Sequence, residues 1–159
     1  MTTKIMRSKI LHYLNTGTLV SPTWSLINEG VSSLTTNFNP EWEEEAYIAD
    51  TSKTKYTSGL AVETSFDMNR VKGDIANDKI FLLVWGRKVG ADADLELLTV
   101  NMAATATNGD NYPAIKDTVS VIYNSLGDEA IKPLKIGVVL GHQGDKTAGV
   151  YDVSAKTFA

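Results

Sequence analysis

Apolar and polar residues alternate along several short segments of the chain, and this alternation predicts β-strands. The clearest case is residues 60–68, where Leu60, Val62, Thr64, Phe66 and Met68 share one face of a half-buried strand. Further strands are expected at 8–14, 23–27, 31–38, 41–48, 95–103 and 115–125. Two more, at 134–140 and 150–153, are expected to form a hairpin across the glycine-rich segment 141–149.

One segment has helical periodicity instead. Its apolar positions recur every three or four residues, at Ile80, Phe81, Val84 and Trp85. Gly73-Asp74 supplies an N-cap, Arg87-Lys88 suits the last turn, and Gly90 suits a left-handed C-terminal position. The spacing places Trp85 beside Phe81, so Trp85 is expected in the core.

About eight strands and one helix predict a mainly β chain. The expected architecture is an antiparallel β-sandwich or partial barrel with one flanking α-helix and a long inter-strand loop. The length of 159 residues fits one domain, so residues 1–159 are interpreted as a single β domain. The polar stretch 49–59 has no apolar periodicity and is expected to be this loop, exposed to solvent. Loops of this length are usually functional or disordered.

The amino-acid composition excludes several classes of function. The chain has no cysteine, which excludes thiolate catalysis, zinc–thiolate sites and a disulfide framework. The net charge of −4 argues against tight nucleic-acid binding, which depends on Lys and Arg. No apolar run approaches the roughly twenty residues that span a bilayer, and residues 1–7 do not have the pattern of a signal peptide. No membrane association is therefore expected, and synthesis in the cytoplasm fits best.

Candidate sites for metals and phosphates are weak. Asp92, Asp94 and Glu96 alternate, but they lack the dense ligand pattern and central glycine of a calcium loop. The segment 141–149 contains Lys146-Thr147 but no Gly-Lys-Thr tripeptide, so no phosphate site is expected. No metal or cofactor is predicted.

The two histidines, His12 and His142, lie outside any motif with a serine nucleophile or a metal-ligand spacing. A catalytic pair would have to be assembled by folding alone, so structural or exposed roles are expected for both. A small hydrolase has the least support, because a nucleophile elbow is missing.

Several local sequences, in their order along the chain, resemble the major tail proteins of long-tailed bacteriophages, which form the tail tube. Residues 24–34 (WSLINEGVSSL) resemble that family's opening strand pair, and 39–50 resemble the step into its long loop. Residues 74–90, with RKVGADA at 87–93, resemble its helix and the segment that follows the helix. Residues 149–158 (GVYDVSAKTF) resemble its last strand. None of these segments is a catalytic signature. Their order and their coverage of most of the chain carry the resemblance.

The resemblance implies a non-enzymatic virion protein without a cofactor. Such a subunit forms closed, usually hexameric rings that stack into a tail tube, after synthesis and assembly in the host cytoplasm. Its partners would be copies of itself, then tape-measure, tail tip and terminator proteins, with DNA passing transiently and non-specifically. Contractile tails and tail-like bacteriocins share this architecture, so the resemblance leaves the type of machine open.

The polar loop 49–59 is then the expected contact between subunits or between rings. Its candidate residues are Asp50, Thr51, Ser52, Lys53, Thr54, Lys55, Tyr56 and Thr57. An acidic run precedes it, consisting of Glu41, Glu43, Glu44 and Glu45, which are candidates for an anionic lumen or outer surface. A solvated face is favoured over a cation site, and alternation on a strand should separate Glu43 and Glu45 from Glu44.

A carbohydrate-binding β-sandwich is the alternative function. It rests on Trp24, Trp42 and Trp85, which would have to form an exposed sugar-stacking platform. Aromatic residues also concentrate in cores and at subunit interfaces. A binding module would be monomeric, and this difference in association state separates the two hypotheses.

Overall fold

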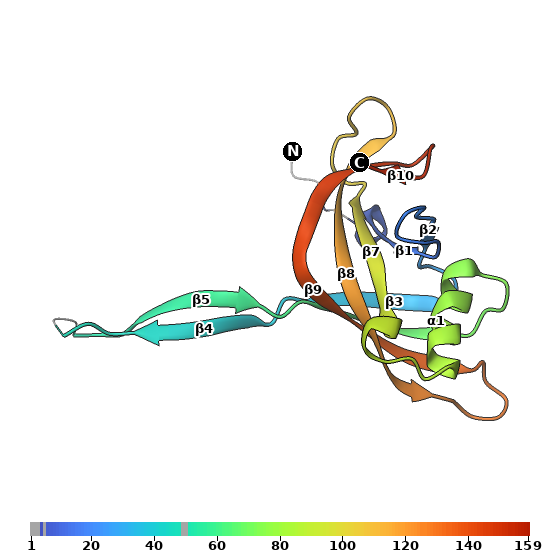
Figure 1. Cartoon of the computed structure of the whole chain (residues 1–159), viewed down its shortest axis with the longest axis horizontal. Helices are drawn as coiled ribbons and strands as arrows, with labels where there is room; N and C mark the ends of the chain where they lie inside the picture. The colour runs from blue at the N-terminus through green and yellow to red at the C-terminus, as the bar shows by residue number, and fades with distance from the viewer. Residues whose placement is uncertain (1–3, 5, 49–50) are drawn as a thin grey trace.

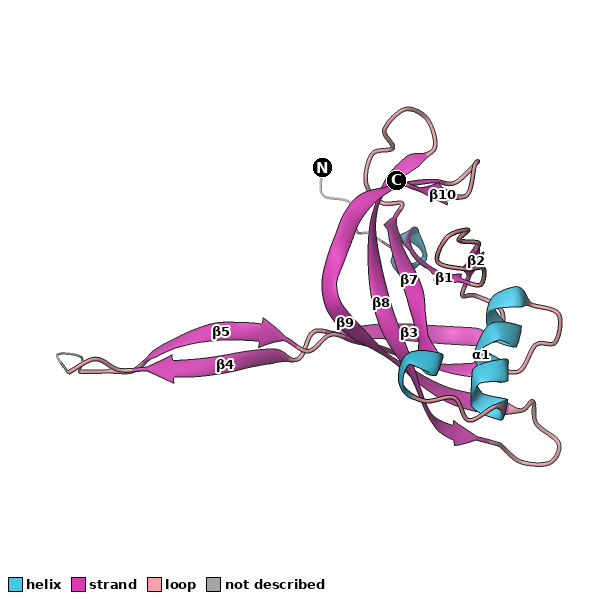
Figure 2. Cartoon of the chain, in the orientation of Figure 1, coloured by secondary structure: helices cyan, strands magenta, loops and turns pink. Residues whose placement is uncertain are grey.

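The computed structural model describes residues 4, 6–48 and 51–159, and in these residues the chain is mainly β with one α-helix (Figures 1 and 2). The strands are β1 (Ile10–Asn15), β2 (Trp24–Leu26), β3 (Val31–Asn37), β4 (Pro40–Glu45), β5 (Thr54–Leu60), β6 (Glu63–Asn69), β7 (Asp94–Asn101), β8 (Asn111–Leu126), β9 (Lys135–Asp152) and β10 (Thr157–Phe158). The helix is α1 (Ile75–Trp85), and short 3₁₀ turns span Arg7–Lys9 and Gly90–Ala93.

The main sheet is antiparallel and curled. Its strand order is β2-β1-β7-β8-β9-β6-β3, and β10 pairs with β9. The two central strands are long, 16 residues in β8 and 18 in β9, and their pairing contains two register shifts. Such irregularities bend a strand, and β9 is visibly curved in Figure 1. The predicted class, a mainly β partial barrel with one flanking helix, is confirmed.

One face of the sheet packs against α1 and forms the larger core. Phe66 and Met68 of β6 are buried there, with Ile80 and Val84 of α1 and other apolar residues from the central strands. The predicted alternation in this segment is therefore confirmed from Thr64 onward. It fails at Leu60, because β5 ends at that residue and β6 begins only at Glu63.

The predicted C-terminal hairpin across residues 141–149 is wrong. These residues lie inside the continuous strand β9, which pairs with β8 from Ile136 to Asp152. Gly149 permits a close approach of backbone within the strand, since a β-carbon there would collide with the carbonyl oxygen of Ala159, and Gly144 takes a positive φ of 64° within β9. The terminal hairpin is formed by β9 and β10.

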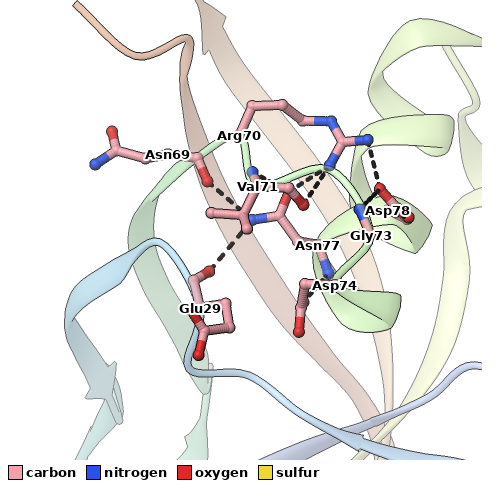
Figure 3. A network of polar contacts seen from close by, with 8 residues as sticks. All are labelled: Glu29, Asn69, Arg70, Val71, Gly73, Asp74, Asn77 and Asp78. Carbon is pink, nitrogen blue, oxygen red and sulfur yellow. Dashed lines mark hydrogen bonds and ion pairs between the residues drawn. The ribbon is translucent and has the colours of Figure 1, made fainter.

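The N-terminus of α1 is fixed by a polar network around a buried asparagine (Figure 3). Asp74 is the N-cap, as predicted, and its side chain accepts from the Asn77 backbone N–H at 2.8 Å. The Asn77 amide donates to the carbonyls of Asn69 and Glu29, and its oxygen accepts from the Val71 backbone and from Arg70. Asn77 thereby joins the helix to the end of β6 and to the turn before β3.

The C-terminus of α1 differs from the prediction. The helix ends at Trp85, Gly86 is the C-cap in a right-handed conformation, and Arg87 takes the positive φ of 49°. Trp85 is 70% exposed, so its expected burial in the core is wrong, although its ring stacks on Phe81 at 5.9 Å between centroids.

A smaller apolar cluster covers the opposite face of the sheet. Trp24 and Tyr151 are buried in it, and the rings of Tyr13 and Tyr151 lie 4.9 Å apart. This cluster anchors β2 and β10 to the central strands.

Candidate assembly surface

The most unusual feature of the molecule is an arm, formed by β4 and β5 (Figure 1). The two strands pair with each other, and in the described residues neither pairs with the main sheet. Every residue of β4 is exposed, as is nearly all of β5. An isolated two-stranded hairpin is marginally stable in water. We therefore expect the arm to be stabilised by a partner.

The base of the arm is defined by a backbone bend at the edge of the sheet. β3 is the last strand in the sheet order and pairs with β6 as far as Asn37 and Glu63. Asn39 then takes a positive φ of 35°, a conformation that asparagine tolerates well, and its carbonyl accepts from the Ala61 N–H at 3.1 Å. This hydrogen bond joins the two ends of the segment that connects β3 to β6. The arm therefore extends away from the main sheet.

The two faces of the arm differ in chemistry. On one face, the Tyr56 hydroxyl lies 3.0 Å from Glu43 Oε2 and 3.1 Å from Glu45 Oε1. These hydrogen bonds raise the pKa of Tyr56. On the other face, the Glu44 carboxylate forms ion pairs with Lys53 at 3.4 Å and Lys55 at 3.3 Å. The predicted separation of Glu43 and Glu45 from Glu44 is thus confirmed.

The predicted loop 49–59 proves to be largely a strand. Residues Thr54, Lys55, Tyr56 and Thr57 belong to β5, while Thr51, Ser52 and Lys53 precede it, and Asp50 lies outside the described residues. The expected exposure is present at each described member of the set. Glu41, Glu43, Glu44 and Glu45 lie on β4 opposite them, so folding brings both predicted groups together.

Large apolar side chains are also exposed on the arm. Trp42 on β4 is 58% exposed, and Tyr47 and Ile48 beyond β4 are exposed as well. Exposed apolar and aromatic residues gathered on one element are typical of interaction surfaces.

A cavity of about 550 Å³ lies next to the base of the arm. Phe38, Leu60 and Val62 line it from the arm side, and His12, Asp117 and His142 line it from the sheet. The strands that contribute these residues are far apart in sequence, so no local motif could have indicated the cavity.

Within this region, Asp117, His142 and Thr64 are connected in the order of a catalytic triad. His142 Nδ1 lies 3.3 Å from Asp117 Oδ2, and its Nε2 lies 3.0 Å from Thr64 Oγ1. The Thr64 side chain is 0% exposed, does not line the cavity and also bonds to Thr36. A nucleophile must reach its substrate, so this arrangement supports a structural network that joins β3, β6, β8 and β9.

His12 is buried at the same cavity, and the Thr99 hydroxyl lies 3.2 Å from its Nδ1. Burial, with additional repulsion from Arg7 and His142, lowers the pKa of His12 to about 4. The neutral imidazole is therefore the form that the fold accommodates near neutral pH.

Other candidate sites are not assembled by the fold. Among residues 4, 6–48 and 51–159, no group of three or more His, Asp or Glu side chains is placed to hold a metal ion. Glu96 instead bonds to Asn15 and Lys116. In the same part of the chain, no helix has the length and apolar character to cross a membrane. The three tryptophans lie on β2, β4 and α1, with Trp24 buried, so they do not form one platform.

Comparison with solved structures places this architecture in a known class. A chain of the SPP1 tail tube, solved by solid-state NMR and cryo-electron microscopy, matches with a TM-score of 0.64 at 11% identity, covering 91% of this chain and 78% of that one. A chain of the sixfold-symmetrised anti-feeding prophage baseplate matches with a TM-score of 0.53 at 8% identity, covering 93% and 97%. Neither protein-family models nor curated proteins give a match. The chain has the fold of phage tail tube proteins.

Proposed function

We propose that this chain is a non-enzymatic structural subunit of a phage tail or tail-like tube. In this proposal residues 1–159 act as one domain, copies of which assemble into rings, most simply hexamers, that stack around a channel for DNA. The observation that best supports the proposal is the arm. It is a hairpin without a core of its own, and it exposes aromatic and charged residues. Such a hairpin is expected to be stabilised by contact with another subunit. The likeness in fold to the SPP1 tail tube supports it.

The edges of the main sheet support self-association as well. The sheet ends at β3 on one side and at the three-residue strand β2 on the other. An unpaired edge invites strand pairing, and a ring of identical subunits satisfies such edges without leaving them in solvent. We assign contacts between subunits or rings to residues 51–57 of the arm, and an anionic surface to the acidic residues of β4.

The other expected partners follow from this role. A tube of this kind works with tape-measure, tail tip and terminator proteins, and with DNA through weak, non-specific contacts. It would be made and assembled in the host cytoplasm and act in the tail of the virion. The net charge of −4 suits a wall past which DNA slides.

Negative-stain electron microscopy of the purified chain over a concentration series tests the proposal. Rings or hollow tubes of uniform diameter are the expected result. A monomer at all concentrations that binds a defined glycan on an array would refute it in favour of the carbohydrate-binding alternative.

A further inference from the structure

The outer side of α1 exposes three large apolar side chains, and Asp78, which is paired with Arg70, lies among them. Ile75, Leu82 and Trp85 are 61%, 64% and 70% exposed, and they lie on the side of the helix opposite its buried residues. An amphipathic surface helix carries polar residues on its outer side, whereas a helix that is apolar all round is normally buried. This face is therefore expected to be covered in the assembled protein.

Three basic residues lie on α1 or within a few residues of its ends. Lys79 lies on α1, Arg87 follows its C-terminus, and Lys72 precedes its N-terminus. None of the three has an ion-pair partner among the described residues, whereas Asp78 on the same helix is paired with Arg70. The surface thus combines exposed apolar side chains with uncompensated positive charge on or near the helix.

The arm presents the complementary arrangement. Tyr56 lies on one face of the arm, and Glu43 and Glu45 project on the same side and accept from its hydroxyl. These two carboxylates have no cationic partner in the part of the chain that the structure describes, because Lys53 and Lys55 pair with Glu44 on the other face. An aromatic side chain beside two carboxylates matches the face of α1.

The two surfaces lie at opposite ends of the long axis of the molecule, so the arm of one chain cannot reach its own helix (Figure 1). We infer that the acidic face of the arm docks on the outer face of α1 in a second copy of this chain. Such a contact joins two different surfaces, so it is heterologous and propagates from copy to copy into a ring or an open helix. This inference rests on the proposed function and names the partner surface of the arm.

Disulfide trapping tests the contact directly, because the chain has no cysteine of its own. Thr54→Cys places a thiol beside Tyr56 on the acidic face, and Leu82→Cys places one at the centre of the helix face. Each variant is oxidised alone, and the two are then mixed and oxidised. We expect a disulfide-linked dimer only in the mixture, since the bond requires the two β-carbons to lie within about 4.5 Å.

The other outcomes of trapping overturn the inference. A dimer of Leu82→Cys alone would show helix-to-helix packing, and a dimer of Thr54→Cys alone would show arm-to-arm packing. If the mixture forms tubes in the electron microscope without the mixed disulfide, the proposed function stands and this contact is wrong. If it forms neither, this contact is wrong, and electron microscopy of the unsubstituted chain decides the proposed function.

Charge reversal gives an independent test. Lys79→Glu with Arg87→Glu is expected to raise the concentration required for assembly at least about tenfold, and so is Glu43→Lys with Glu45→Lys. All four changes in one chain should restore assembly, because every copy then carries two matched surfaces. Lys156→Glu, which reverses one charge at an exposed residue in the turn between β9 and β10, is the control and should leave assembly unchanged. Failure of the fourfold variant to recover, while the control assembles, contradicts the pairing.

Discussion

Tyr56 and Glu43 face each other across the arm, and the phenol donates to Glu43 Oε2 at 3.0 Å. Glu45 competes for the same proton at 3.1 Å, and a phenol has only one proton to donate. The hydroxyl thus keeps two carboxylates together on this face of the arm. It also links β4 to β5 at a point where no core supports the pairing.

The first prediction concerns the titration of this phenol. Both hydrogen bonds stabilise the protonated form and raise the pKa of Tyr56, so Glu43→Gln with Glu45→Gln should lower it. Carbon-13 NMR of labelled tyrosine rings measures the shift. Glu44→Gln is the matched control, since Glu44 lies on the other face and contacts the lysines. An equal shift in the control would contradict the assignment of the two faces.

The second prediction separates assembly from folding. Replacing residues 40–60 with a Gly-Gly turn should leave the melting temperature within about 3 °C, because the removed residues contribute little to either apolar cluster. The hydrogen bond between Asn39 and Ala61 already brings the two ends together, so a short turn can join them. Assembly, measured by electron microscopy and sedimentation, should be lost.

Two results would oppose this second prediction. Unfolding of the variant would mean that the arm supports the body, and normal tubes would mean that assembly does not require it. The full chain under the same conditions is the reference.

The sequence predicted β6, which has one buried face, and missed β5, which has none. β6 alternates visibly because Phe66 and Met68 meet a core. β5 shows no period because the chain by itself buries neither of its faces, and a segment without a buried face has no reason to alternate. Its strand character appears only once its pairing with β4 is known.

The predictions for Trp85 and for the glycines of β9 were wrong for different reasons. Helical spacing predicts burial only if the outer side of the helix is polar, and α1 is apolar on both sides. Glycines usually indicate turns, but Gly149 lies in a strand where the C-terminal residue approaches its backbone. The Asp117–His142–Thr64 network was not predictable at all, because three separate strands supply its members.

The third prediction concerns the buried network at the start of α1. Asn77→Ala should lower the free energy of unfolding by about 2–4 kcal/mol, because the side chain that is removed is buried and bonds to the carbonyls of Asn69 and Glu29 and to the Val71 N–H. Asp74→Ala removes only the N-cap and should lower it by about 1 kcal/mol. Urea unfolding followed by circular dichroism measures both. Equal losses would show that Asn77 acts only through the cap.

The last prediction follows from His12. Its pKa is about 4 in the folded chain and 6.5 when unperturbed, so between these values the unfolded chain binds more protons. Stability should therefore be fully present above pH 6.5 and fall as the pH decreases toward 4. The loss should reach about 2 kcal/mol at pH 5, from the general value of 1.36 kcal/mol per pKa unit.

Urea unfolding of the wild-type chain and of His12→Gln at pH 7.5 and pH 5 measures this loss. His12→Gln should reduce the difference between the two pH values by about 2 kcal/mol, because glutamine does not titrate. The variant is less stable than the wild type at pH 7.5 if glutamine packs poorly beside Thr99, but this loss is the same at both pH values and cancels in the difference. An unchanged pH dependence in His12→Gln would mean that another group is responsible and that His12 is accessible to protons in the folded state.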